Sequence, residues 1–147
     1  MDKNKEYEGY VNDYKSKKVQ IESLKKVLTE QFDTIILWGA GLKGMAFLEC
    51  FDEQNQWIDF VVDSNEEKQG TYLDTGHPIR DIESVSEDMV IIITNEKFYD
   101  SICISLIMKR YRVSKIKLLC IEAYLDERIS LDDIKSGKVW KRRKYYD

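Results

Sequence analysis

Three glycines and one aspartate have the residue types and spacing that most directly indicate ligand chemistry in this chain. Gly39, Gly41 and Gly44 follow an apolar run at residues 35–38. A second apolar run ends on Asp63, nineteen residues after Gly44. Glycines at this spacing let a chain turn sharply out of a strand, let its backbone approach a pyrophosphate, and let the next helix lie close to the strand. The N-terminus of that helix then presents free N–H groups and its positive dipole end to the anion.

Asp63 has the position at which a ribose 2′-hydroxyl would need a hydrogen-bond acceptor. In βαβ units that bind dinucleotides, such an acid follows the glycine turn by about 20 residues. Its charge would repel a 2′-phosphate, so the pattern favours NAD over NADP. The alternative is that the glycines serve only the turn and the helix packing and that Asp63 merely ends a strand, because a fold alone does not set a function.

Apolar runs alternating with helical patterns must position these residues. Strands are expected at residues 34–39, 57–62, 89–94 and 116–121. Helices are expected at residues 42–52 and from Phe98 to near Lys109 or Tyr111, with a short extended piece at 77–80 and a brief helix at 82–85. This alternation predicts an α/β fold with a Rossmann-like, doubly wound parallel sheet of four to five strands. The crevice is expected at the carboxyl edge, where the glycine turn, Asp63 and Thr94–Asn95 converge.

The first 31 residues have apolar side chains at a seven-residue spacing. These are Tyr7, Tyr10, Tyr14, Ile21, Leu24 and Leu28. Lys17 takes the one expected apolar position that fails. The spacing predicts one long amphipathic helix over about residues 5–31. This helix either packs against the sheet domain or self-associates, and the second alternative would make the protein a homodimer.

We divide the chain into this helix at 1–31, a nucleotide-binding domain at 32–122 and a tail at 123–147. In the tail, Ser130 is expected to cap a small helix that ends at Gly137. Residues 138–146 then interleave bases with aromatic side chains, as in segments that bind single-stranded nucleic acid. A solvated terminus, or a strap on the protein's own acidic surface, is the favoured interpretation of so short a segment.

Charge and cysteine usage exclude several classes of protein. Residues 32–134 carry 20 acids and 10 bases, which argues against binding to duplex nucleic acid. Apolar runs of about five residues are far shorter than the ~20 needed to span a bilayer, and no signal-peptide core is present, so we expect a soluble, cytoplasmic protein. Cys50, Cys103 and Cys120 are odd in number and lack ligand spacing, which favours buried free thiols over a disulfide or a metal site.

No residue pattern identifies a catalytic centre, and the catalytic residues are unknown at this point. His77 is the single histidine, and its position between Gly76 and Pro78 favours a loop histidine over an acid–base catalyst. The serines lack a nucleophile-elbow context. Tyr99 is followed four residues later by Cys103 rather than by the lysine that short-chain dehydrogenases use.

Four segments carry a resemblance to known families: residues 38–44, 60–72, 76–79 and 90–95. The most specific of them is the D-x-N-x-x-K-x-G string from Asp63 to Gly70. Over residues 35–121 the chain resembles the Rossmann-like C-terminal domain of bacterial sugar C-methyltransferases. More loosely, it is similar to the N-terminal nucleotide-binding domains of nucleotide-sugar acetyltransferases.

The resemblance implies a module of sugar or surface-polysaccharide metabolism that holds a nucleotide, a nucleotide-sugar or a dinucleotide such as NAD. It implies that Asn65 and Lys68 organise the loop after Asp63 or contact phosphate or base, while Lys43 points towards anion or solvent. From the length of the chain we expect no methyltransferase domain, and the sequence contains neither zinc-type cysteines nor hexapeptide repeats. The cofactor-binding residues expected from all these patterns are Gly39, Ala40, Gly41, Leu42, Lys43, Gly44, Asp63, Ser64, Asn65, Lys68, Thr94 and Asn95.

Three functions therefore stay open. The leading hypothesis is an accessory nucleotide-binding module without complete catalytic machinery, with no metal. A small NAD-dependent sugar epimerase or reductase is the enzyme alternative, with its substrate site completed by the N-terminal helix, the tail or a second subunit. A ligand-free protein-interaction scaffold is the third.

Overall fold

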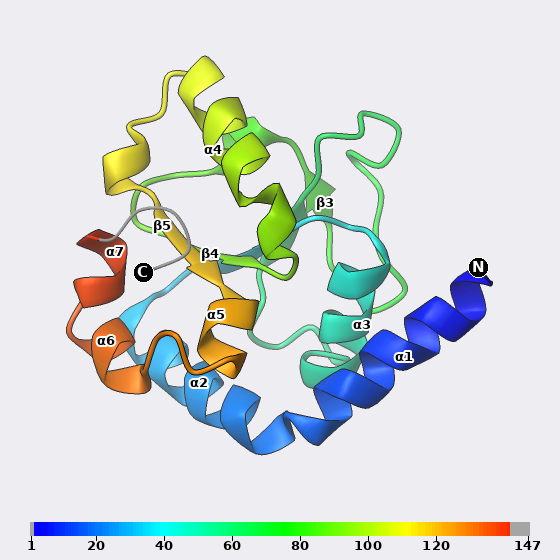
Figure 1. Ribbon diagram of the computed structural model, residues 1–147. Helices are drawn as coiled ribbons and strands as arrows, with labels where there is room; N and C mark the ends of the chain where they lie inside the picture. The colour runs from blue at the N-terminus through cyan, green and yellow to red at the C-terminus, as the bar shows by residue number, and fades with distance from the viewer. Residues whose placement is uncertain (1, 142–147) are drawn as a thin grey trace.

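The computed structural model describes residues 2–141 and contains one five-stranded sheet in which all strands are parallel (Figure 1). The strands lie in the order β3-β2-β1-β4-β5. Their bounds are β1 Ile35–Trp38, β2 Phe60–Val62, β3 Ile79–Arg80, β4 Val90–Ile93 and β5 Lys117–Cys120. The Rossmann-like, doubly wound sheet that the sequence predicts is confirmed, with β1 in its centre.

Burial explains why these short runs form strands. All four residues of β4 are buried, and its neighbour β1 is buried except at Trp38. A parallel sheet covered on both faces requires such continuous apolar runs. The strand expected from residue 57 begins only at Phe60, because the backbone N–H groups of Trp57 and Ile58 donate to the Asp52 carboxylate instead of to a neighbouring strand.

Helices cover both faces of the sheet. α3 (Leu42–Phe51) connects β1 to β2, and α4 (Tyr99–Met108) connects β4 to β5. These two crossovers step across the sheet in opposite directions, so right-handed connections place the two helices on opposite faces. The remaining elements are η1 (Ile82–Ser84), η2 (Glu96–Phe98), η3 (Val113–Lys115), α5 (Ile121–Leu125), α6 (Leu131–Lys135) and α7 (Lys138–Lys141).

The single N-terminal helix expected from the sequence is wrong: two helices are present. α1 (Lys3–Ser16) ends and α2 (Lys18–Gln31) begins at Lys17, whose φ of −105° and ψ of 14° are not helical. The break lies at the position where the apolar spacing fails. It lets α1 run along α3 while α2 turns beneath the sheet (Figure 1).

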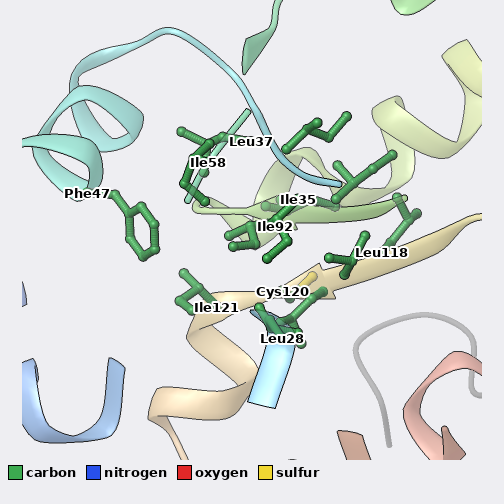
Figure 2. Close-up of a cluster of buried hydrophobic side chains, with 14 of the residues drawn as sticks. Leu28, Ile35, Leu37, Phe47, Ile58, Ile92, Leu118, Cys120 and Ile121 are labelled. Carbon is green, nitrogen blue, oxygen red and sulfur yellow. The ribbon is translucent and has the colours of Figure 1, made fainter. Parts of the chain in front are cut away.

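The apolar side of these two helices packs inside the protein, as the first of the two sequence alternatives requires. Its buried side chains are Tyr14, Ile21, Leu24, Val27 and Leu28. Figure 2 shows side chains of β1, β4 and β5 gathered with Phe47 of α3 and Leu28 of α2 in one core. The Tyr14 ring packs edge-on against Phe47 and Phe51, with centroids 5.5 and 5.7 Å away.

His77 lies in the core rather than in a solvated loop. It is fully buried, and its Nε2 lies 2.7 Å from Oδ2 of the buried Asp52. If Nε2 carries the proton, Nδ1 is left to accept from the Thr75 hydroxyl, 2.5 Å away. Asp52 follows the last residue of α3, so this pair ties the end of the helix to the loop that precedes β3.

The tail begins as expected and then continues the fold. Ser130 caps α6 in a reciprocal capping box with Asp133, and Gly137, at φ +76°, directly follows the cap residue Ser136. The first part of the basic aromatic segment forms α7, where Val139 is buried and the Trp140 ring meets Phe32 at 5.9 Å. Residues 142–146 of that segment lie outside the described residues.

The three cysteines are free thiols. Cys120 is buried, as expected, but Cys50 and Cys103 are only partly buried. Within residues 2–141, no helix combines the length and the apolarity that crossing a membrane would need.

Candidate functional site

The glycine turn has the geometry that its sequence predicts at two of its three positions. Gly39 adopts φ +106°, which L side chains rarely tolerate. A Cβ on Gly44 would lie 2.3 Å from the carbonyl oxygen of Gly39, so only glycine lets α3 lie this close to the end of β1. Gly41 caps the N-terminus of α3 without a side chain, and a Cβ there would meet no atom within 4 Å.

A cavity of about 440 Å³ opens in front of this turn, over the carboxyl ends of β1, β2 and β4. Ten of the twelve residues expected at the site line it. They are Gly39, Gly41, Leu42, Lys43, Gly44, Asp63, Ser64, Lys68, Thr94 and Asn95. The first turn of α3 faces this space with no side-chain cap, as an anion site at a helix N-terminus requires.

The other two expected residues, Ala40 and Asn65, support the turn instead of lining the cavity. Asp63 Oδ2 accepts from the Ala40 N–H at 2.7 Å, and Oδ1 accepts from the Asn65 N–H at 2.8 Å. The Lys68 ammonium donates to the Ala40 carbonyl oxygen at 3.3 Å. Each carboxylate oxygen of Asp63 still has capacity for a second donor. Asp63 therefore braces the loop and retains acceptor sites at the cavity wall.

Helix α1 supplies a wall that the sequence reasoning missed. Glu6 and Tyr10 line the cavity, and the Tyr10 hydroxyl donates to Glu6 Oε1 at 2.9 Å. This hydrogen bond, together with partial burial, raises the pKa of Tyr10. The regular tyrosine spacing indicated a packed helix face, but it gave no indication that this face meets the glycine turn. Trp38, Ile93, Phe98, Ser101 and Ile102 complete the wall and were not expected either.

Lys43 lines the cavity, and its side chain is 25% exposed. Its ammonium is 3.3 Å from Glu122 Oε1 and 5.7 Å from the centre of the Tyr10 ring. Glu122 is the second residue of α5, and its Oε1 also accepts from the Glu96 N–H at 2.8 Å. The Lys43 side chain is thus held beside the glycine turn by elements from both ends of the chain.

A second cavity, of about 420 Å³, continues the first along the edge of the sheet towards β3. The two cavities share Trp38, Asp63 and Ser64 in their linings. The second is lined by the acids Glu66, Asp81 and Glu83 and by one base, Lys109, which pairs with Glu83 at 3.6 Å. The glycine-turn end of the crevice therefore carries two lysines beside the acids Glu6 and Asp63, whereas the β3 end has an excess of acids.

The described residues show no metal centre at this site. Across residues 2–141, no group of three or more His, Cys, Asp and Glu side chains is arranged to hold a metal ion. Burial raises the pKa of the Cys120 thiol to about 12, which keeps it protonated and a poor nucleophile. His77 faces Asp52 inside the core and does not line the crevice.

Comparison with known proteins gives one match. The family model described as the C-methyltransferase C-terminal domain matches residues 1–106. No curated protein and no solved structure matches the chain. The matched region includes both N-terminal helices, the glycine turn and Asp63, whereas β5 and the later helices, with Glu122, follow it.

Proposed function

The chain belongs to the family of C-methyltransferase C-terminal domains, and from this premise we propose that it is an accessory module that binds a nucleotide-sugar or a dinucleotide during sugar modification. The observation that carries the proposal is the open cavity at the uncapped N-terminus of α3. A pyrophosphate placed there would meet N–H groups of the first helical turn and the positive end of the helix dipole.

The charges of the crevice support one orientation of such a ligand. Lys43 and Lys68 lie at the end beside the glycine turn, where they would offset a pyrophosphate. The acids at the β3 end would repel a further phosphate but would accept hydrogen bonds from ribose or sugar hydroxyls. This charge pattern favours NAD or a nucleotide-sugar over NADP.

A binding role fits the site better than a complete enzyme does. The described residues that line the cavity include no histidine and no cysteine, and the single histidine is buried elsewhere. We therefore propose that the chemistry of sugar modification is performed by other protein groups and that this module holds the substrate or a cofactor.

A ligand-free scaffold is the second candidate, and one observation favours it. The N–H and the carbonyl oxygen of Ala40 already have partners in Asp63 and Lys68. A glycine turn braced in this way keeps its shape without a ligand. The two candidates differ in whether the cavity is filled by a small molecule.

Thermal unfolding with NAD, NADP, UDP-glucose and dTDP-glucose, run beside Gly41→Asp, tests the proposal. The backbone of Gly41, at φ −82°, accepts any residue, and aspartate is a favourable N-cap. Gly41→Asp should therefore unfold no lower than the wild type, while its carboxylate occupies the anion position and abolishes ligand stabilisation. A ligand at ~100 times its dissociation constant should stabilise the wild type by about 2.7 kcal/mol.

The matched control is Gly9→Asp, the same substitution on the exposed side of α1, which does not line the cavity. It should retain the full ligand shift. A wild type that responds to none of these compounds would favour the scaffold. A ligand shift that persists in Gly41→Asp would place the ligand elsewhere.

A further inference from the structure

Glu122 of α5 places a negative charge beside the glycine turn. Its Oε1 lies 3.3 Å from the Lys43 ammonium, and the two side chains are 32% and 25% exposed. Lys43 lines the crevice, whereas Glu122 is not among the lining residues. Glu122 would therefore act on a ligand in the crevice through its charge and through its pairing with Lys43.

The Glu122 carboxylate is held in place from behind. It accepts from the backbone N–H of Glu96 at 2.8 Å. The Glu96 carboxylate is in turn bound by the Arg128 guanidinium, with its two oxygens at 3.0 and 2.8 Å from one nitrogen. Lys43 thus has a counter-charge that is fixed by two other segments of the chain.

Acids and bases balance at this end of the crevice. The charged residues that line it are Glu6, Lys43, Asp63 and Lys68. Two positive charges thus face two negative charges, and Glu122 adds a further negative charge at Lys43. A pyrophosphate here would be bound mainly by helix N–H groups and the helix dipole, because the lysines are already offset by acids.

A balanced site limits the negative charge that a ligand can bring. A terminal phosphate has a second pKa of about 6, so near neutral pH it carries one charge more than a phosphate esterified on both sides. The lining residues that the structure describes supply no surplus base to offset that charge. Nucleotides that end in a free phosphate are therefore poorly matched to this site.

We infer that Glu122 determines specificity at this site, by favouring a pyrophosphate esterified at both ends over a nucleotide that ends in a free phosphate. The inference rests on the proposed function, because it concerns the same site. It narrows the ligand class to nucleotide-sugars and dinucleotides, and it assigns the selection to a residue outside the crevice lining.

The charge of Glu122 reaches the wall that a ligand would touch. Tyr10 lines the crevice, and the centre of its ring lies 5.7 Å from the Lys43 ammonium. The hydrogen bond to Glu6 and burial raise the pKa of Tyr10, and the charge of Glu122 adds to that rise. A carboxylate that disfavours a phenolate at the wall also disfavours added negative charge on a phosphate beside Lys43.

Glu122→Gln tests the inference. The amide has the size of the carboxylate, and its oxygen can still accept from the Glu96 N–H, so circular dichroism should show a folded chain. Calorimetric titration at low ionic strength gives Kd for two ligand series: UDP-glucose, UDP and UTP, and NAD, ADP and ATP. Within each series the base is constant and the charge of the phosphates increases.

The variant should bind every ligand of the responsive series more tightly, and the gain should grow with ligand charge. At separations of about 4 to 8 Å in water, one pair of unit charges changes an equilibrium constant roughly two- to fivefold. Each added ligand charge should therefore increase the gain by about that factor, and salt should reduce it. A purely structural role of Glu122 would change all three dissociation constants by the same factor.

Two further variants complete the test. Lys43→Gln should have the opposite effect and weaken binding most for the triphosphate, because it leaves the charge of Glu122 unpaired. Glu53→Gln is the matched control, since it makes the same change of net charge at an exposed residue that lines neither part of the crevice. It should leave the order of the three dissociation constants and their ratios as in the wild type.

The outcomes separate this inference from the proposed function. An equal change for all three ligands in Glu122→Gln, or no change, would overturn the inference while the esterified ligand still binds and the binding role stands. A wild type that binds the triphosphate more tightly than the esterified ligand of its series would also overturn it. A wild type that binds no member of either series would overturn the binding role and this inference together.

Discussion

The polar groups at the two ends of α3 differ in whether other protein groups bind them. At the C-terminal end, the Asp52 carboxylate accepts from the backbone N–H groups of Gln56, Trp57 and Ile58 and pairs with His77, all near or inside the core. At the N-terminal end, Gly41 offers no side chain and the first turn faces a cavity. Asp52 at the C-terminal end has its hydrogen-bond partners within the protein, whereas the N-terminal end can still bind a ligand.

The two aspartates at these ends, Asp63 and Asp52, differ in their exposure to solvent. Both accept backbone N–H groups, but Asp63 is partly exposed at the crevice, whereas Asp52 is 4% exposed and pairs with an imidazole that is fully buried. The Asp63 carboxylate lines an open cavity, whereas the His77 ring and the residues Trp57 and Ile58 that donate to Asp52 are buried. An aspartate buried with all its partners thus stabilises the fold, whereas the same side chain at an open cavity can also bind a ligand.

The largest expected effect on stability comes from removing the buried Asp52 carboxylate. Asp52→Ala should lower the free energy of unfolding by about 3–5 kcal/mol, because His77 and the N–H groups of the following segment lose their buried partner. Urea denaturation measures the change. Asp63→Ala is the paired variant, and its loss should be clearly smaller because Asp63 is partly exposed and accepts from fewer backbone N–H groups than Asp52 does. Equal losses for both variants would remove the contrast between the two ends.

Low pH should remove the stabilisation that Asp52 provides at the C-terminal end of α3. Burial alone would raise the pKa of Asp52. Hydrogen bonds from His77 and from the N–H groups of Gln56 and Ile58 nevertheless hold this pKa below its ordinary value. The unfolded chain then takes up the proton first, so this stabilisation is present at neutral pH and is lost as the pH falls below about 4. Denaturation midpoints of the wild type should drop more steeply over that range than those of Asp52→Asn. Parallel curves would contradict the linkage.

At the open end, the close approach of helix and strand should be sensitive to one methyl group. Gly44→Ala would put a Cβ 2.3 Å from the Gly39 carbonyl oxygen, a backbone atom that cannot move aside. Overpacking of this kind costs about 1–3 kcal/mol, which outweighs the gain of up to about 1 kcal/mol that alanine brings to a helix interior. Thermal unfolding should show a lower midpoint. Gly9→Ala in α1, where a Cβ meets open space, should instead raise it.

The smallest effect is expected at the hydroxyl of Tyr14, which is buried without a hydrogen-bond partner in the part of the chain that the structure describes. Burial raises the pKa of this phenol, with Glu122 adding to the effect. Tyr14→Phe keeps the ring against Phe47 and Phe51 and removes the unpaired group. It should leave stability unchanged or slightly higher in urea denaturation. A marked loss would mean that the hydroxyl has a partner after all.

Local sequence was sufficient for much of the fold and for the centre of the site. The alternation of apolar runs with helical patterns predicted the parallel sheet, and the glycine spacing predicted the turn at Gly39 and the close packing at Gly44. The same spacing rule also marked Lys17 as the irregular position in the N-terminal helix. These features follow from backbone sterics and periodic burial, which act over a few neighbouring residues.

The partners of the polar side chains follow from the packing of distant segments and could not be predicted from local sequence. Only the folded chain shows that Glu6 and Tyr10 of α1 line the cavity. It also shows that Asp63 accepts from the Ala40 N–H and that His77 is buried against Asp52. The physical reason is that a hydrogen-bond partner can come from any distance along the chain, whereas a glycine or an apolar period constrains its own neighbourhood. The local residues therefore set the shape of the turn, and the packing of distant segments set how much of that turn is left open.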